Sequence, residues 1–125
     1  MATDLDPRLY ELFLGKEELL PLWFRLREHI ETFGPDIRVP VRDRYAELDR
    51  AGEVFGIVEP TAHRRMRLGL HNPGLPTDAR FLEAVEFGPR RITHRVTLTE
   101  DAQIDEDLHA RLHAAYMLAL EGEPR

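Results

Sequence analysis

The stretches Val54-Phe-Gly-Ile-Val58 and Arg65-Met-Arg-Leu-Gly-Leu70 decide the fold of this chain. The first is a short run of mainly apolar residues, and in the second the apolar residues recur at every other position. Both patterns are typical of β-strands, because successive side chains of a strand point to opposite faces of a sheet. Two further runs, Phe81–Phe87 and Arg91–Leu98, complete a set of predicted antiparallel strands, although residues 78–87 begin like a helical turn.

The residues before this region extend the same pattern. Ile37–Val41 alternates between apolar and polar positions, and Pro40 indicates an edge strand because proline cannot donate to a central ladder. Tyr45–Arg50 also alternates, and Ala51-Gly52 then supplies a tight turn into the next strand. We therefore expect an antiparallel sheet of about five strands over residues 36–98.

Helical segments flank the predicted sheet. Residues 1–16 contain a short leading helix, and residues 17–34 a longer one whose apolar positions recur at helical spacing. A C-terminal helix over residues 105–121 begins at Asp105, whose carboxylate can cap free N–H groups. The predicted fold is α+β, a single domain over residues 1–125 with the N-terminal and C-terminal helices packed on one face of the sheet.

Composition limits the class of protein. The 125 residues are 42% hydrophobic and 32% charged, with a net charge of −6, which suits a soluble folded domain. The sequence has no cysteine, so disulfides and thiolate sites are excluded, and no apolar run is long enough to cross a membrane. The N-terminus carries acidic residues where a secretory signal carries basic ones. We expect a cytoplasmic protein that makes no contact with a membrane.

His94 is the most interesting single residue. Its strand places Ile92, Val96 and Leu98 on one face, and the period of two puts His94 on that same face, towards the helices. A half-buried imidazole there can serve as a general base or a ligand contact. The alternative, which we favour, is a core histidine that is hydrogen-bonded to a backbone carbonyl or to the Tyr116 hydroxyl.

Arginines gather on the other face of the predicted sheet. Residues 59–98 hold seven arginines against four acidic residues in an otherwise acidic chain. Those expected on this face are Arg65, Arg67, Arg91 and Arg95. They form either a surface for phosphate or carboxylate groups or a ladder of ion pairs with acids on the Tyr45–Arg50 strand, and we favour the ladder. Only Tyr45 is placed to stack with bases, so nucleic acid is an unlikely partner.

The C-terminal helix carries one spacing that a metal ion could use. Asp105, His109 and His113 are four residues apart and share one helical face. A single linear face rarely closes a coordination sphere, so we interpret these residues as a solvated surface. We expect no metal and no other cofactor.

The order and spacing of several short motifs resemble a known family. The motifs are Val54-Phe-Gly-Ile-Val-Glu-Pro60, Met66-Arg-Leu-Gly-Leu70, Gly88-Pro-Arg-Arg-Ile-Thr-His94 and Ala115-Tyr116. Together with Phe13, Gly15 and the helix over Trp23–Gly34, they resemble the domain-of-unknown-function family 5655, some members of which are labelled predicted transport proteins. The resemblance implies the fold and a bacterial origin, and it implies no activity. The turn Thr61–Arg64 only partly matches the basic turn of that family.

Three functions remain open at this point. The first is a non-catalytic module that binds a small anionic ligand or a protein, with a site near His94, Tyr116 and Trp23 between the helices and the sheet. The second is a small enzyme that uses His94 as acid or base while Arg91 holds an anionic substrate. The third is an interaction module that pairs with a protein partner, or with a second copy of itself, through the open sheet face.

Overall fold

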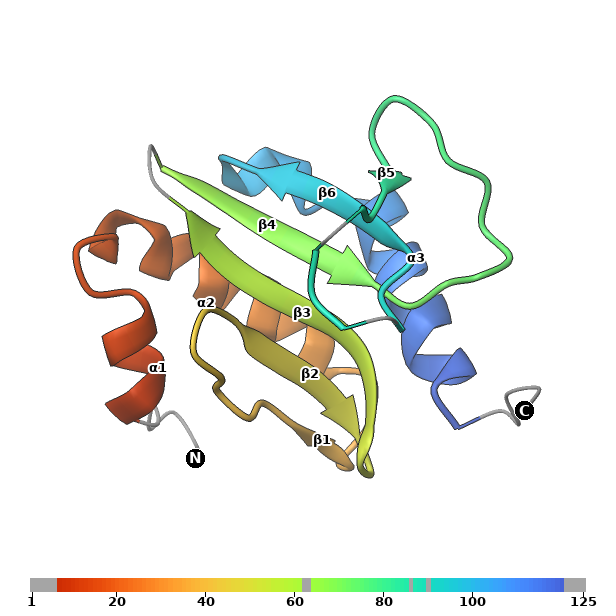
Figure 1. The fold of residues 1–125 in the computed structure, drawn as a ribbon, viewed down its shortest axis with the longest axis horizontal. Helices are drawn as coiled ribbons and strands as arrows, with labels where there is room; N and C mark the ends of the chain where they lie inside the picture. Colours follow the sequence, from red (N-terminus) through yellow and green to blue (C-terminus); the bar gives the residue numbers. More distant parts are fainter. Residues whose placement is uncertain (1–6, 62–63, 86, 90, 121–125) are drawn as a thin grey trace.

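The fold is built around a six-stranded, fully antiparallel sheet with the strand order β1-β2-β3-β4-β6-β5 (Figure 1). The computed structural model describes residues 7–61, 64–85, 87–89 and 91–120. The strands are β1 (Ile37–Arg38), β2 (Ala46–Arg50), β3 (Glu53–Thr61), β4 (Arg65–Leu70), β5 (Leu82–Glu83) and β6 (His94–Leu98). The predicted α+β class is confirmed, with six strands where about five were expected.

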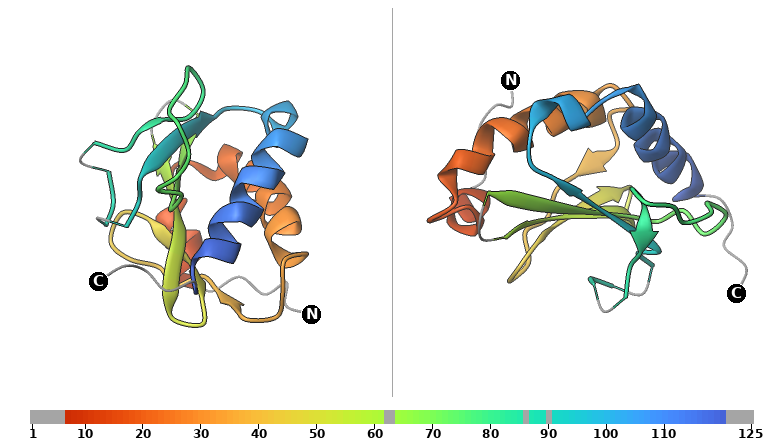
Figure 2. Two further views of the ribbon diagram at one scale, coloured as in Figure 1. Left: turned by 90° about the vertical axis from the view of Figure 1, so that its right-hand side faces the viewer. Right: turned by 90° about the horizontal axis from the view of Figure 1, so that it is seen from above.

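The helices lie on one side of this sheet. They are α1 (Pro7–Leu12), α2 (Leu20–Glu31) and α3 (Glu106–Leu118), with 3-10 turns η1 (Glu17–Leu19) and η2 (Asp101–Gln103) before the two longer ones. In the right-hand view of Figure 2, α2 and α3 both lie above the sheet. Asp105 caps α3 as predicted, because its side chain accepts a hydrogen bond from the Leu108 N–H.

The helix predicted over residues 17–34 is shorter and divided. Its first turn is the 3-10 turn η1, and Pro21 follows at the start of α2, where a missing N–H costs nothing. The α-helix ends at Glu31, and the Thr32 hydroxyl donates to the carbonyl of His29. The predicted apolar stripe is nevertheless the buried face of α2, since Leu22, Trp23 and Leu26 are all at most 5% exposed.

One continuous core fills the space between the helices and the sheet. Alternate residues of the central strands form its sheet side, and the apolar faces of α2 and α3 pack against them from the other side. Met66, Leu68 and Leu70 of β4 are completely buried there, opposite Leu98, Val96 and His94 of β6. The helix-facing side of the sheet is therefore the one that the period of two predicts.

Two strands differ from their predicted lengths. Of the described residues in the predicted strand Phe81–Phe87, only Leu82–Glu83 pair with β6, and β6 itself begins at His94 instead of Arg91. Ile92 N donates to Pro89 O in a turn, which takes Arg91 and Ile92 out of the sheet, while Thr93 N still donates to Leu70 O. β3 is longer than expected, because it continues to Thr61 opposite Arg65.

The chain between β5 and β6 packs on the other face of the sheet. Phe87 and Ile92 form a second, smaller apolar cluster with Ile57 of β3, and Tyr45, Val54 and Ala84 pack against it. Figure 2, right, shows this connection below the sheet, opposite the helices. The expectation of an open second face is therefore wrong over this area, because these apolar side chains are buried against the strands.

Gly69 makes this close packing possible. A methyl group at Gly69 would lie 2.7 Å from Ile92 Cγ2 and 2.9 Å from Ile57 Cγ1. Both neighbours are buried branched side chains, so neither has free space to move into.

We predict that Gly69→Ala lowers the free energy of unfolding by about 1–3 kcal/mol, the usual cost of overpacking a core. Urea denaturation monitored by circular dichroism measures this change. Gly74→Ala is the matched control, because no atom lies within 4 Å of a Cβ at Gly74, and it should change stability little. Equal effects of the two substitutions would contradict the packing described here.

Candidate functional site

The three residues expected between the helices and the sheet are all in the interior. His94 and Tyr116 are each 4% exposed and Trp23 is 1% exposed. None of them lines the two clefts described below. The Trp23 indole N–H has no hydrogen-bond partner among the described residues, although the ring is buried in the core. That these three residues bind a ligand remains a prediction. The contacts that His94 and Tyr116 make in the structure are with other parts of the protein.

His94 fastens a loop to the sheet. Its Nε2 lies 2.8 Å from the carbonyl oxygen of Leu75, and its Nδ1 lies 2.7 Å from the Thr93 hydroxyl. A carbonyl can only accept, so Nε2 carries the proton, and in the neutral ring Nδ1 accepts from Thr93. This is the backbone-carbonyl arrangement that we favoured for a core histidine, and it leaves neither ring nitrogen open to a substrate.

The same region holds two more contacts, between the loop and the residues that lead into β6. His71 Nδ1 lies 2.8 Å from the carbonyl oxygen of Arg91, and the N–H of Asn72 donates to the Thr93 hydroxyl at 2.9 Å. Both His71 and Asn72 are buried. The imidazoles of His71 and His94 thus hold residues 71–75 against the start of β6.

We predict that His94→Phe destabilises the domain by about 1–3 kcal/mol, because it keeps a ring in the core but leaves the Leu75 carbonyl and the Thr93 hydroxyl without this partner. Chemical denaturation measures the loss, and limited proteolysis should show faster cleavage near Leu75. His113→Phe changes an exposed histidine and serves as the control. Unchanged stability of His94→Phe would show that the two hydrogen bonds do not hold the loop.

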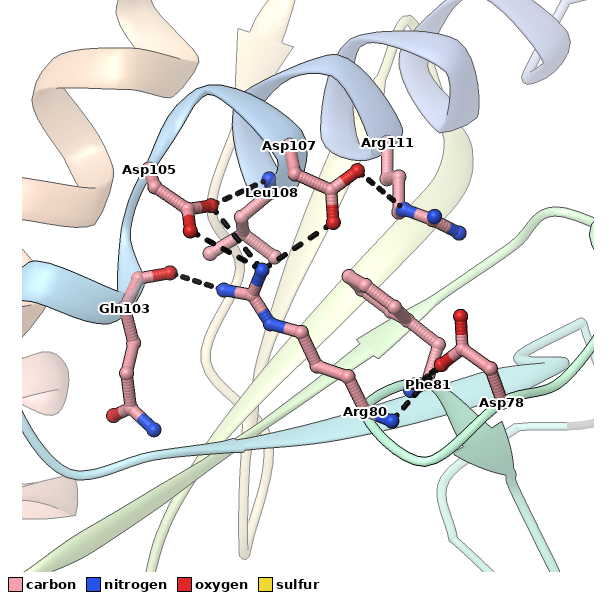
Figure 3. A network of polar contacts seen from close by, with 8 residues as sticks. All are labelled: Asp78, Arg80, Phe81, Gln103, Asp105, Asp107, Leu108 and Arg111. Atoms are coloured by element: carbon pink, nitrogen blue, oxygen red, sulfur yellow. Dashed lines mark hydrogen bonds and ion pairs between the residues drawn. The ribbon is translucent and has the colours of Figure 1, made fainter.

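The far end of this loop is fixed by Arg80, as Figure 3 shows. Its guanidinium donates to the carbonyl of Gln103 and contacts the carboxylates of Asp105 and Asp107 at 3.2 and 3.3 Å. The hydrogen bond from the Leu108 N–H, with help from Arg80, holds the pKa of Asp105 below its usual range. Asp105 therefore serves as a helix cap and as the ion-pair partner of Arg80. It is not free to act as the third metal ligand beside His109 and His113.

Tyr116 belongs to a compact polar cluster that joins α3 to the edge of the sheet. Its hydroxyl donates to Asp36 Oδ1 at 2.6 Å, and Arg50 donates to Asp36 Oδ2 at 3.0 Å. The Arg50 guanidinium also lies 3.9 Å from the centre of the Tyr116 ring. The hydrogen bond to Asp36 raises the pKa of Tyr116 and lowers that of Asp36. The hydroxyl is thus paired with Asp36 and not with His94.

The predicted arginines have partners other than the ones expected. Arg67 Nη2 contacts Glu59 Oε1 at 2.6 Å, directly across the β3–β4 pair. Arg91 donates to the carbonyl of Val54 and lies 3.6 Å from Glu53. Arg65 is exposed at the start of β4.

The expected ion pairs between these arginines and the acids of β2 do not form among the described residues, because the β2 acids have other partners. Glu47 contacts Arg42 at 3.1 Å, and Asp49 accepts the N–H of Gly52 in the turn that follows. Two acids do neutralise part of the arginine face, but both come from β3: Glu59 pairs with Arg67, and Glu53, the first residue of the strand, pairs with Arg91.

A cleft of about 300 Å³ opens on this arginine-bearing face, beside the second apolar cluster. Its walls come from the residues before β2, the end of the β3–β4 hairpin and the connection after β5. The lining residues are Arg44, Tyr45, Glu59, Arg67, Phe87, Gly88 and Pro89. Arg67 lies over the Phe87 ring, 4.6 Å from its centre, so the aromatic ring holds the guanidinium at the cleft.

Some of the hydrogen-bond donors that line this cleft have no partner among the described residues. Arg44 is exposed and makes no hydrogen bond or ion pair with any residue that the structure describes, and the Tyr45 hydroxyl has no partner there either. Arg67 spends Nε and Nη2 on the same oxygen of Glu59, at 3.1 and 2.6 Å, which leaves Nη1. Two guanidiniums against one carboxylate give the cleft a net positive charge.

A second cleft, of about 210 Å³, lies between η1 and the chain after β6. It is lined by Leu19, Pro21, Leu22, Glu18, Arg64, Thr99, Glu100 and Asp101. Three carboxylates face one arginine there, so its charge disfavours an anion. The first cleft is the better candidate for the anionic ligand that the sequence suggested.

Comparison with known proteins places the chain in a family. The model of a domain of unknown function, DUF5655, matches residues 10–119. The chain belongs to the DUF5655 family. No curated protein and no solved structure matches it. Among the described residues, no helix is long and apolar enough to span a membrane.

Sequence reasoning named Arg67 but missed Arg44, Glu59 and the wall formed by Phe87–Pro89. Glu59 had a usable signal, because it is as far before the β3–β4 turn as Arg67 is after it. No comparable signal marks Arg44 or the Phe87–Pro89 wall. Arg44 lies on the chain before β2, and the wall Phe87–Pro89 is formed by the connection after β5 folding back over the sheet, so the two meet only in the folded domain.

Proposed function

We propose that this DUF5655 domain is a non-catalytic module that binds a small anionic ligand in the cleft lined by Arg44 and Arg67. The observation that carries the proposal is a positively charged hollow whose Arg44 guanidinium has no partner among the described residues. A bacterial cytoplasm is the setting that the composition and the family resemblance favour.

The donors suit a phosphate or carboxylate group. A guanidinium presents paired N–H groups that match the two oxygens of a carboxylate or the oxygens of a phosphate. Arg44 offers such a pair, Arg67 adds Nη1, and the Tyr45 hydroxyl offers a further donor on the same cleft. The volume of about 300 Å³ is at the lower end of the range for small-molecule sites.

Glu59 restricts which anion fits. It faces the cleft beside Arg67, and its second carboxylate oxygen accepts no hydrogen bond from a described residue. A ligand that combines an anionic group with a hydroxyl or amine donor satisfies both Arg44 and Glu59. A polyanion meets repulsion from the same carboxylate.

Binding without catalysis is favoured over the enzyme alternative. His94 uses both ring nitrogens on Thr93 and Leu75, and Arg91 is directed to Val54 and Glu53. These contacts direct the two side chains to different segments of the chain, so the geometry supplies no reason to combine them in one reaction.

We predict that the tag-free protein is stabilised against heat by inorganic phosphate or by a small hydroxy- or amino-carboxylate. A ligand at 100 times its Kd raises the free energy of unfolding by about 2.7 kcal/mol, which a thermal-shift assay detects. Arg44→Ala and Arg67→Ala should each raise Kd by about tenfold or more, since each removes a charge-assisted hydrogen bond.

Arg38→Ala is the matched control, because Arg38 is an exposed arginine of β1 that does not line the cleft. It should leave Kd unchanged in the same titration, followed by isothermal calorimetry. An equal loss of affinity in Arg38→Ala would contradict the proposed site. So would the failure of phosphate and of every hydroxy- and amino-carboxylate tested to stabilise the wild-type protein.

A further inference from the structure

Two histidines from different helices meet at the α2–α3 contact. His29 lies in the last turn of α2, and His109 lies in the second turn of α3. Their Nδ1 atoms are 2.8 Å apart, and their ring centres are 5.0 Å apart. Both side chains are half-buried, so solvent reaches one side of the pair.

The contact requires at least one neutral ring. A hydrogen bond between two Nδ1 atoms has one nitrogen as donor and the other as acceptor, so a second proton has no place between them. Burial, and then the proximity of His109, lower the pKa of His29. The neutral imidazole, with a lone pair on Nδ1, is the form in which histidine binds metals.

Neighbouring groups hold the two rings in place. The Phe33 ring packs edge-on against His109, with 5.2 Å between centres, and against His113 at 5.0 Å. Around His29, Arg25 is paired with Glu28 at 3.2 Å, which offsets the repulsion that a free arginine would exert on a cation. His29 lies in the last turn of α2, where the helix dipole favours positive charge, whereas His109 lies near the N-terminus of α3, where the dipole disfavours it.

We propose that His29 and His109 bind a divalent transition-metal ion of the Zn²⁺ or Cu²⁺ class through their Nδ1 atoms. The ring that donates in the hydrogen bond releases its Nδ1 proton to solvent and takes up a proton at Nε2, so both rings bind the ion as neutral imidazoles through Nδ1. This site is separate from the anion cleft and does not depend on it.

The geometry is close to what such an ion needs. Bonds of about 2.0–2.1 Å at a tetrahedral angle place two nitrogen ligands about 3.3 Å apart. The rings therefore separate by about half an ångström, which small side-chain rotations supply. No group of three His, Asp or Glu residues is gathered for a metal within the part of the chain that the structure describes, so water completes the coordination. We infer a labile site with open positions.

Metal preference follows from the ligand type. Imidazole nitrogen suits copper, zinc and nickel, and affinity rises towards Cu²⁺ in the usual order for divalent ions. Mg²⁺ and Ca²⁺ prefer oxygen ligands and should not compete. Affinity should fall as the pH drops, because protons and the metal compete for the same nitrogens.

The test is Cu²⁺ binding to the full, tag-free chain, followed by electron paramagnetic resonance with detection of coordinated imidazole nitrogens. One equivalent of Cu²⁺ should show two imidazole ligands in the wild type. His29→Gln and His109→Gln should each leave one and raise Kd at least tenfold. His113→Gln is the control on the same helix and should keep both ligands and the wild-type Kd.

Circular dichroism establishes that each variant is folded before it is titrated. If a glutamine variant does not fold, the wild-type spectrum still decides, because a two-imidazole signal supports the pair and its absence overturns it. Retention of the two-imidazole signal in both His29→Gln and His109→Gln would also overturn the proposal, since the copper would then be bound elsewhere.

Discussion

The close approach of a loop to the sheet at Gly69 is the constraint on which the second face of this domain depends. Ile57 and Ile92 leave no room for a side chain at that position, so the strand backbone itself forms the floor of the smaller apolar cluster. The loop can pack directly on the sheet only because Gly69 has no side chain to hold Ile92 away from the strand. Phe87 then reaches Arg67 and positions its guanidinium at the edge of the cleft. Packing on one side of the sheet thereby creates the charged hollow beside it.

The two faces of the sheet serve different purposes. The helix side is a buried, mainly apolar core in which the polar groups of His94 and Tyr116 are paired with a carbonyl and a carboxylate. Such pairing is what burial demands, because an unpaired polar group in the interior is costly. The other face keeps charged groups with unused hydrogen-bonding capacity, notably Arg44. Recognition is therefore proposed where hydrogen-bonding capacity remains open, away from the groups that stabilise the core.

Local pattern predicted most of the fold. The period of two in β4 and in β6 from His94 onward, the apolar stripe of α2 and the Asp105 cap of α3 each depend on residues close in sequence, and each is confirmed. The face expected for Ile92 is wrong, because Ile92 precedes β6 and packs in the smaller cluster on the other side of the sheet. The segment Phe81–Phe87 was predicted as a strand, yet among its described residues only Leu82–Glu83 pair with β6. Phe81 is buried in the main core and Phe87 in the smaller cluster, whereas Leu82 and Val85 are exposed. A pattern of hydrophobicity cannot distinguish these environments from a paired strand.

The candidate sites depended on contacts between distant segments, and these were predicted less well. Single-strand periodicity placed His94 on the correct face, but its partner Leu75 lies in a loop with no regular pattern. His109 was noted with His113 because they share a helix, while His29, 80 residues away in the chain, was not. The same limit applies to Arg44. Sequence spacing identifies neighbours along one element, whereas sites arise where elements meet.

The central claim is that an anion binds on the sheet face opposite the helices. An NMR titration of ¹⁵N-labelled protein with inorganic phosphate and with a small hydroxycarboxylate tests it most directly. Binding in the cleft should give saturable shifts confined to the backbone amides of Arg44, Tyr45, Arg67 and Gly88 and to the arginine side chains among them. Saturable shifts centred on the Trp23 indole and His94, or no saturable shift at all, would contradict it.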